Sequence, residues 1–236
     1  MKLLALWSPP RCRSTAFWRM IAERGDFVAI HEPFCHLVNY GHSEVAGHIV
    51  HTEEQVIAQL YVAAQVRPVF FKDCTPYAYP AVLADATFLR RCIHTFLIRD
   101  PRDVISSHYA INPNVTQDEI GFSHLHTLYE AVRAATGTDP TVLDADDLAA
   151  RPETVVRAWC ARVGINHRPE SLNWAPGDRP EWSDGGDWHF EVRISTGLRS
   201  GSRRYPDTVM NNSTLATYLD HQLPYYDDLR QRRIRD

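Results

Sequence analysis

The sequence predicts an α/β fold in which a parallel β-sheet is flanked by helices, within one domain of 236 residues. Three observations predict this fold. Short apolar runs alternate with helical patterns over residues 3–165, as in parallel strands joined by right-handed crossovers. Two of the runs end in charged loops that lead into helix starts, at 8–15 and 99–103. Such loops, at the carboxyl ends of strands, are where open α/β sheets bind ligands.

The individual elements follow from apolar periodicity and from helix boundary signals. Pro101 and Pro152 suit the first turn of a helix, and Gly164 suits the position after a helix end. Residues 166–206, rich in Trp, Pro, Gly and Asp, are expected to form a loop or lid region rather than a second domain. The predicted strands are 3–7, 27–30, 68–72, 92–98 and 140–144, and the predicted helices are 14–24, 53–65, 78–86, 101–110, 117–136 and 152–163, with an irregular stretch up to residue 52.

Composition and charge narrow the class of protein. The chain is 44% hydrophobic and 23% charged, as in ordinary soluble domains, and its net charge of −4 disfavours broad nucleic-acid binding. No apolar run reaches transmembrane length, and Pro9 and Pro10 end the opening run too early for a signal peptide. The five cysteines form no C-x-x-C pair, which favours reduced thiols and a cytoplasmic protein without membrane association.

The loop after the first strand, Pro10-Arg-Cys-Arg-Ser-Thr15, is predicted to bind an anion. Ser14 and Thr15 are expected to cap the following helix. The free N–H groups of that helix start, its dipole and the side chains of Arg11 and Arg13 all favour a phosphate or phosphosulfate. Cys12 lies in the same loop, where a helix start favours a lowered thiol pKa, although a small loop residue suits its place better than a catalytic thiol.

Two common nucleotide-binding patterns are missing from the sequence. Neither G-x-x-x-x-G-K-[ST] nor G-x-G-x-x-G occurs, so there is no Gly-Lys pair and no standard Mg²⁺ site. Arginine is expected to replace the charge of a metal ion, and no metal cofactor is expected. The histidines at 36, 42, 48 and 51 fit no common zinc spacing and are interpreted as surface or acceptor-lining residues.

A second charged loop follows the predicted strand 92–98. Asp100 suits an N-cap and Pro101 the first helical position, so Arg99 is expected at the end of the strand. Ser107 falls about two turns into the helix. The guanidinium and the hydroxyl are therefore predicted to converge on one phosphate, which the planar fork of an arginine binds in bidentate fashion.

Residues 10–15 resemble the 5′-phosphosulfate loop of sulfotransferases that use 3′-phosphoadenosine-5′-phosphosulfate (PAPS), usually close to Pro-Arg-Ser-Gly-Thr-Thr. Arg13, where glycine is common, resembles a bacterial branch with Arg-Ser-Thr at that point. Ile98-Arg-Asp-Pro-Arg-Asp-Val104 is similar to the family's 3′-phosphate segment, in which an Arg and a Ser eight positions later bind that phosphate, as Arg99 and Ser107 are spaced here. Residues 142–165 resemble the family's acidic loop and Pro-Glu helix, and the match beyond them is weaker.

The resemblance implies a P-loop-like sheet of the sulfotransferase fold and a PAPS-dependent enzyme. Such an enzyme moves a sulfuryl group in line to a hydroxyl, or an amine, of a small-molecule acceptor and releases adenosine 3′,5′-bisphosphate. Arg11, with Arg13, Ser14 and Thr15, is expected to stabilise the charge that develops on the donor. Lys72, which ends the strand 68–72, resembles a lysine that many family members carry at a strand end.

The general base is less well defined by the sequence. Glu32, about twenty residues after the first loop, resembles the base of one bacterial branch and is favoured. His31 is adjacent, but neighbouring strand residues point to opposite sides, so both are not expected to face the donor. Asp73 and Cys74 stand where the cytosolic aryl-type enzymes have Thr-His, so that histidine is missing. The choice among Glu32, His31 and Asp73 stays open.

A late basic segment, 193–204, resembles the loop with which many sulfotransferases close over the nucleotide. Ser195, Thr196, Gly197 and Arg199 are expected near the adenosine or the 3′-phosphate, although a solvated charged loop fits equally well. An acceptor pocket is expected to be apolar and aromatic. The aromatic residues that suit its wall, or equally the core, are Phe34, Tyr40, Tyr77, Tyr79, Tyr109, Trp174, Trp182 and Trp188.

Two other functions fit parts of the pattern. A P-loop-like kinase or phosphotransferase would use the same fold, but the Gly-Lys-Ser/Thr triplet is missing. A non-catalytic nucleotide-binding protein would not need Arg11, Ser14, Arg99 and Ser107 together. The sequence defines neither the acceptor, whose binding loops follow no general code, nor the oligomeric state.

Overall fold

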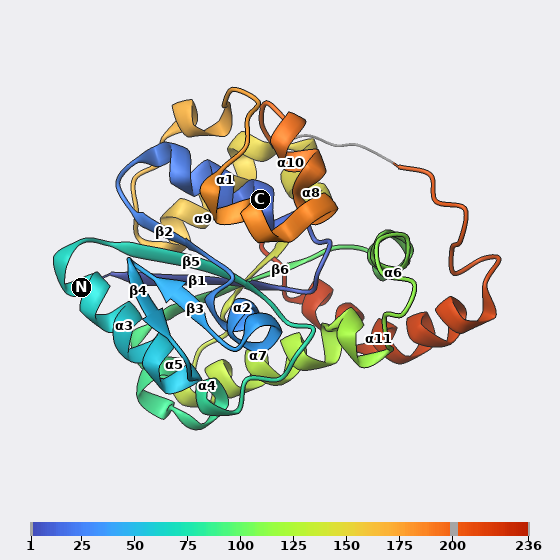
Figure 1. Cartoon of the computed structure of the whole chain (residues 1–236), viewed down its shortest axis with the longest axis horizontal. Coiled ribbons are helices and arrows are strands. Elements are labelled where there is room, and N and C mark those ends of the chain that lie inside the picture. The colour runs from blue at the N-terminus through green and yellow to red at the C-terminus, as the bar shows by residue number, and fades with distance from the viewer. Residues whose placement is uncertain (1, 199–202, 236) are drawn as a thin grey trace.

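The computed structural model describes residues 2–198 and 203–235 (Figure 1). Five parallel strands form the central sheet in the order β2-β5-β1-β6-β7, which confirms the predicted fold class. The strands are β1 (Leu3–Ser8), β2 (Val28–His31), β5 (Val69–Cys74), β6 (Ile93–Ile98) and β7 (Thr141–Asp144). Because β1 lies in the middle, its carboxyl end is flanked by those of β5 and β6.

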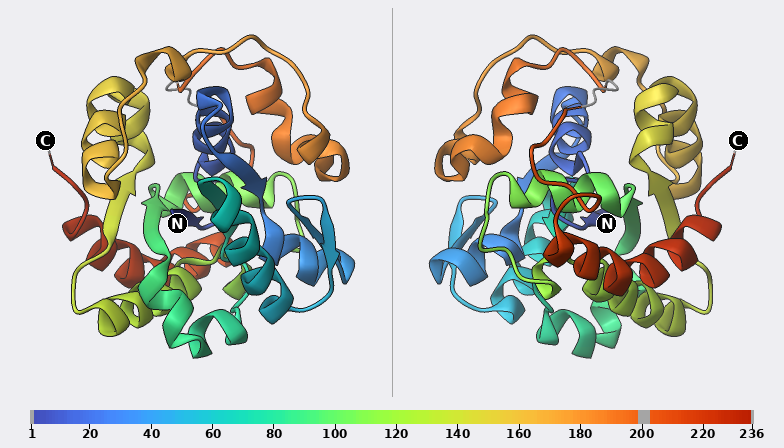
Figure 2. Two further views of the ribbon diagram at one scale, coloured as in Figure 1. Left: turned by 90° about the vertical axis from the view of Figure 1, so that its left-hand side faces the viewer. Right: turned by 90° about the vertical axis from the view of Figure 1, so that its right-hand side faces the viewer.

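Helices cover both faces of this sheet (Figure 1). On one face lie α1 (Ser14–Arg24), α8 (Ala145–Ala150), α9 (Pro152–Val163) and α10 (Phe190–Ile194). On the other lie α3 (Glu53–Val66), α4 (Pro80–Ala84), α5 (Ala86–Arg91), α7 (Phe122–Thr136) and α11 (Ser213–Gln231), with α6 (Pro101–Tyr109) packed against α11. Two turned views show the two layers from either end (Figure 2).

The covered strands are buried along their whole length, as expected of parallel strands with helices on both faces. Every residue of β1 and β5 is buried. Trp7 of β1 lies 5.3 Å from Phe71 and 5.7 Å from Phe34 between ring centroids, and its Nε1 donates to Nδ1 of His94 at 2.9 Å. These aromatic contacts fix the central strand against one helical layer.

Several predicted boundaries differ from the structure. The predicted helix 78–86 is two helices, α4 and α5, because Asp85 starts a new one by accepting hydrogen bonds from the N–H groups of Thr87 and Phe88. The stretch predicted as irregular before residue 52 contains α2 (Pro33–Tyr40) and an antiparallel hairpin of β3 (Ser43–Val45) and β4 (His48–Val50). The structure also adds α11, which begins after Asn212 caps it.

The segment 166–206, where it is described, is partly helical. It contains the 3₁₀ helices η2 (Pro169–Leu172) and η3 (Pro180–His189), followed by α10. Trp174 and Trp182 are buried and join the hydrophobic core. A further 3₁₀ helix, η1 (Asp118–Ile120), precedes α7. Among the described residues, no helix is both long and apolar enough to cross a membrane.

Gly121, between η1 and α7, brings three segments of the functional end of the sheet together. Its φ is +92°, and a Cβ atom there would lie 2.5 Å from the carbonyl oxygen of Thr75 and 3.3 Å from Cδ of Pro10. Thr75 in turn donates from Oγ1 to the carbonyl oxygen of Gly121 at 2.9 Å. A side chain at Gly121 would therefore push α7 away from the ends of β1 and β5.

Replacing Gly121 with alanine is expected to lower the free energy of unfolding by about 3 kcal/mol, from left-handed strain together with overpacking. Gly137→Ala is the matched control, because Gly137 has a φ of +72° but no neighbouring atom within 4 Å of an added Cβ. Its expected loss is about 1 kcal/mol. Urea unfolding of both variants measures the difference, and equal losses would contradict the packing described for Gly121.

Candidate functional site

A cavity of about 820 Å³ opens at the carboxyl edge of the sheet. Each strand of the sheet leads to one part of the cavity wall. Across the sheet these parts are Glu32 after β2, Lys72 in β5, the loop after β1, Arg99 after β6, and α8 after β7. The cavity wall contains most of the side chains predicted for the site, namely Arg11, Arg13, Ser14, Thr15, Glu32, Lys72, Arg99, Ser195 and Gly197.

The loop after β1 is backbone-strained at two arginines. Arg11 has a φ of +67° and Arg13 a φ of +64°, in the left-handed region that favours glycine. This backbone explains why glycine is common at the place of Arg13 in the loop that residues 10–15 resemble. Non-glycine residues in this region persist where the surrounding structure holds them, and they cluster at functional sites.

The predicted capping of α1 by Ser14 and Thr15 is wrong. The N-cap is Arg13, and among the described residues no side chain caps this helix. The helix begins at Ser14 itself, so both hydroxyls lie in its first turn and line the cavity. The N–H groups of Ser14 and Thr15 and the two hydroxyls therefore remain available to an anion, whereas those of Ala16 and Phe17 donate to the carbonyl oxygen of Arg13.

The expected lowering of the Cys12 pKa is also wrong. The Cys12 side chain is completely buried, and burial raises the pKa of its thiol. Removal from water opposes the thiolate more strongly than the nearby Arg99 guanidinium favours it. Cys12 does not line the cavity and packs in the core instead.

Arg11, Arg99 and Ser107 meet next to this loop. Arg11 donates from Nε to Oγ of Ser107 at 3.0 Å, and Arg99 donates from Nη1 to the carbonyl oxygen of Arg11 at 3.2 Å. Nη2 of Arg99 donates to Oδ2 of Asp103 at 2.8 Å. Nε of Arg99 is buried and has no hydrogen-bond partner among the described residues. A buried guanidinium N–H without an acceptor is a strong site for an anion.

The Arg11 guanidinium also reaches the segment that covers the cavity. Its Nη1 donates to the carbonyl oxygen of Trp188 at 2.9 Å, and Cζ lies 5.7 Å from the centroid of the Trp188 ring. Burial lowers the pKa of Arg11 below its ordinary value. The charged loop therefore contacts both the pair of Arg99 and Ser107 and the segment from η3.

Glu32 and Lys72 form a buried ion pair at neighbouring strand ends. The Lys72 side chain is 1% exposed and that of Glu32 14%, and Nζ of Lys72 bonds Oε1 of Glu32. Sγ of Cys74 donates to the same oxygen at 3.1 Å. The ammonium of Lys72 holds the pKa of Glu32 well below its usual range despite burial, and the nearby Cys74 and Glu32 raise that of Lys72. Both groups are therefore charged at neutral pH.

Asp73 and His31 lie behind this pair and do not line the cavity. Asp73 accepts from the backbone N–H groups of Phe34 at 2.7 Å, Cys35 at 3.1 Å and Cys74 at 2.9 Å, while burial raises its pKa to about 8. These bonds tie the start of α2 to β5, so the oxygens of Asp73 are committed to the backbone.

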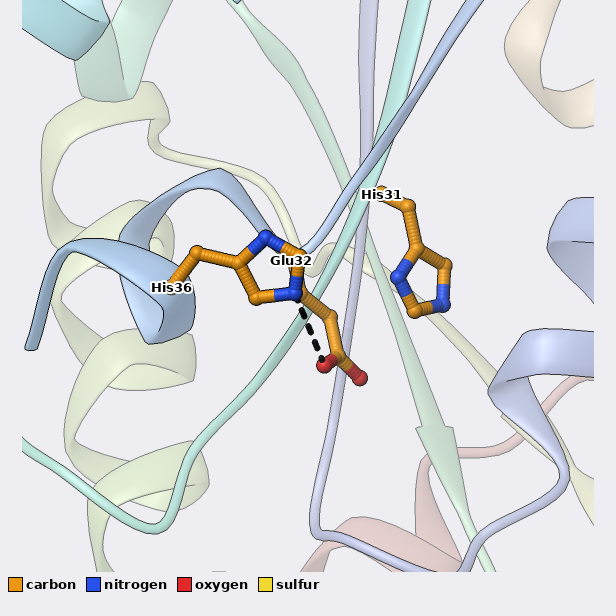
Figure 3. Close-up of side chains that lie close together, drawn as sticks. All are labelled: His31, Glu32 and His36. Atoms are coloured by element: carbon orange, nitrogen blue, oxygen red, sulfur yellow. Dashed lines mark ion pairs between the residues drawn. The ribbon is translucent and has the colours of Figure 1, made fainter. Parts of the chain in front are cut away.

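Strand alternation predicts that His31 and Glu32 point to opposite sides, but in the structure their side chains lie together. The strand ends at His31, and Glu32 takes a left-handed φ of +49°, so the alternation stops there. The imidazole of His31 lies beside the Glu32 carboxylate, with His36 on its other side (Figure 3). Burial lowers the pKa of His31 well below its usual range, so the ring is neutral.

The late segment predicted to meet the nucleotide is partly described. Oγ of Ser195 accepts from Nε1 of Trp174 at 3.1 Å, and the carbonyl oxygen of Thr196 accepts from the N–H of Trp174 at 3.2 Å. Gly197 pairs with Asn173, and a Cβ at Gly197 would lie 2.7 Å from the carbonyl oxygen of Leu172. Ser195 and Gly197 line the cavity, Thr196 does not, and Arg199 lies outside the described residues.

The predicted aromatic wall divides between cavity and core. Tyr40, Tyr77 and Trp188 line the cavity, whereas Phe34 and Tyr79 pack around Trp7 in the core. Several lining residues were not predicted from the sequence, because no local pattern around them indicates a binding site. They are Cys35, Asn39, Cys74, Asn112, Glu119, His108, His189, Glu191, Arg203 and Tyr205, while His36 was interpreted only as a surface or acceptor-lining residue.

The spacing on α2 is the signal that would have found two of these residues. Glu32, His36 and Asn39 stand at i, i+4 and i+7, one face of a helix that begins after Glu32. This face lines the cavity opposite Tyr77, whose hydroxyl donates to Oδ1 of Asn39 at 2.9 Å.

Comparison with known proteins found a matching family and solved structures with a similar fold. A family model described as a sulfotransferase domain matches residues 1–233. Two solved structures share the fold. The sulfotransferase domain of the Synechococcus PCC 7002 olefin synthase has a TM-score of 0.53 at 16% identity and covers 94% of each chain. A sulfotransferase from Alicyclobacillus acidocaldarius has a TM-score of 0.54 at 11% identity and covers 99% of this chain and 97% of that one.

Two longer plant proteins are also similar in sequence. Branched-chain-amino-acid aminotransferase-like proteins 1 and 2 of Arabidopsis thaliana are 28% and 27% identical over 237 and 241 residues. The matches cover 95% and 98% of this chain but only 41% and 42% of those proteins. The chain thus spans less than half the length of the curated relatives it matches.

Proposed function

The chain belongs to the family of sulfotransferase domains, and from that premise we propose that it transfers a sulfuryl group from PAPS to a hydroxyl of a small-molecule acceptor. One observation carries the proposal. A buried ion pair, a strained basic loop and a buried arginine with an unsatisfied N–H lie on four adjacent strand ends around one cavity. Family membership also favours sulfuryl transfer over the phosphoryl transfer that the same fold class allows.

The basic loop and Arg99 would hold the two ends of the donor. The helix start at Ser14 and the guanidinium of Arg11 are suited to the 5′-phosphosulfate. Arg99 and Ser107 are suited to the 3′-phosphate, which would take the buried Nε of Arg99 as a donor. Ser195 and Gly197 line the same cavity and would close on the nucleotide.

Glu32 would act as the base in an in-line transfer. Of the three contenders it is the one that lines the cavity, while His31 and Asp73 lie behind it. The bond between sulfur and the bridging oxygen of PAPS breaks as a bond forms between sulfur and the acceptor oxygen. Glu32 takes the acceptor proton, and adenosine 3′,5′-bisphosphate leaves with the bridging electron pair.

Lys72 would change partners during this reaction. Before the donor binds, Lys72 holds Glu32 ionised but makes it a weak base, because it lowers the pKa of the carboxyl. A phosphosulfate in the cavity offers Lys72 an alternative anionic partner. As Lys72 turns toward the bridging oxygen, it stabilises the leaving group and releases Glu32 to a higher pKa. Donor binding would thus activate the base.

Nucleotide binding tests the donor. We expect adenosine 3′,5′-bisphosphate to bind more tightly than adenosine 5′-monophosphate, and Arg99→Ala to weaken only the bisphosphate, by about tenfold to a hundredfold. Isothermal titration calorimetry measures both nucleotides. Arg102→Ala is the matched control, because Arg102 belongs to the same helix start but its side chain is 52% exposed and pairs with Asp100. Equal binding of the two nucleotides, or equal losses in the two variants, would contradict the proposal.

A second variant separates binding from chemistry. Glu32→Gln is expected to bind adenosine 3′,5′-bisphosphate like the wild type but to transfer sulfuryl groups about 10² to 10⁴ times more slowly, because it cannot take the acceptor proton. Transfer of label from PAPS to a pool of hydroxylated small molecules measures the rate. Glu23→Gln serves as control, since Glu23 pairs with Arg19 on α1 outside the cavity. An unchanged rate in Glu32→Gln would exclude Glu32 as the base.

A further inference from the structure

Three ligand-bearing side chains lie together at the end of β2. His31, Glu32 and His36 each place one ligand atom within 4.8 Å of the other two, and Nε2 of His36 is 4.0 Å from Oε2 of Glu32 (Figure 3). His31 ends the strand, Glu32 is the N-cap of α2, and His36 lies one turn into that helix. The strand-to-helix corner therefore brings two imidazoles to one carboxylate.

His31 is the member of this group whose ring nitrogens are left without a hydrogen-bond partner in the described structure. Its residue is 5% exposed, and both ring nitrogens are buried without a hydrogen-bond partner among the described residues. The rings of Trp18 and His189 pack edge-on against it, with centroids 5.2 Å and 5.0 Å away. A buried imidazole in this state is unfavourable unless something binds its lone pair.

The two oxygens of Glu32 face different partners. Oε1 takes Lys72 and the thiol of Cys74, whereas Oε2 faces His36. One carboxylate can therefore pair with Lys72 and bind a cation at the same time, and its negative charge separates the two positive charges. Neutral imidazoles and one carboxylate are the ligands that Zn²⁺, Co²⁺ and Ni²⁺ take, with positions left open to solvent or substrate.

We propose that His31, Glu32 and His36 bind a divalent transition-metal ion of the zinc type, and that this ion inhibits the enzyme. The proposed transfer uses no metal ion, and a bound ion would instead hold the carboxylate that takes the acceptor proton. The inhibitory consequence rests on the proposed function, whereas metal binding at this corner does not. A free zinc ion or a related ion would thus prevent the Glu32 carboxylate from taking the acceptor proton.

A second cluster on the same chain provides a control. His126, Glu130 and Asp228 also approach one another within 4.8 Å, but all three are partly exposed. Asp228 there already accepts from Arg232, at 2.9 and 3.1 Å, and lies 3.2 Å from His126. Its carboxylate is committed to an arginine through both oxygens, so this cluster is not expected to bind the ion at comparable affinity.

Metal titration of the whole chain tests the site. Calorimetry with Zn²⁺, and the visible absorption of Co²⁺, are expected to show one ion per chain in the wild type. His36→Gln removes a ligand from a side chain that is 26% exposed, so the fold should persist, and we expect at least about a tenfold loss of affinity. His126→Gln and Cys74→Ser are expected to leave affinity unchanged. Unchanged binding in His36→Gln, or loss of binding in His126→Gln, would overturn the proposed site.

Inhibition is measured separately from binding. Zn²⁺ is expected to slow sulfuryl transfer by the wild type in proportion to occupancy of the site and to require about tenfold more ion in His36→Gln. Binding at the site without inhibition would overturn the inhibitory part of the proposal. If no transfer from PAPS were found at all, the proposed function would fail, but the calorimetric comparison of His36→Gln with His126→Gln would still decide whether the metal site exists.

Discussion

The ion pair between Glu32 and Lys72 is the interaction on which the functional end of the molecule depends. It joins the ends of two neighbouring strands inside the protein, where a lone charge would be costly. Glu32 has a lowered pKa, so its contribution to stability is present above the ordinary carboxyl pKa and is lost as the pH falls through the folded value. Lys72 has a raised pKa, so its contribution is lost only as the pH rises through that value. The pair therefore stabilises the site throughout the neutral range.

Around this pair, backbone strain and long-range hydrogen bonds set the shape of the site. Three of the four non-glycine residues with positive φ in the described chain are Arg11, Arg13 and Glu32. Each lies between the end of a strand and the start of the next helix, where the chain turns sharply. Asp73 holds the start of α2 through backbone N–H groups, and Gly121 permits α7 to approach the same strand ends. The parallel sheet aligns these turns along one edge, so the three strained residues line one cavity.

The sequence predicted those parts of the site that local signals control. The alternation of strands and helices gave the fold class, and Asp100 caps α6 as expected, by accepting from the N–H of Arg102. It did not predict α2, because that helix starts from a left-handed Glu32 and is held by the distant Asp73. The cavity wall that α2 carries was missed in consequence. The raised pKa of Cys12 was missed for a similar reason, since burial depends on packing that one segment does not encode.

The proposed function requires that the two phosphate-bearing ends of one nucleotide bind at two anion sites, the loop of residues 10–15 and Arg99, on neighbouring strand ends. A crystal structure with adenosine 3′,5′-bisphosphate bound tests this claim most directly. The account predicts the 5′-phosphate against the loop of residues 10–15 and the 3′-phosphate within hydrogen-bonding distance of Arg99, with Lys72 turned from Glu32 toward the 5′-phosphate. A nucleotide bound outside the cavity, or with its two phosphates in exchanged positions, would contradict it.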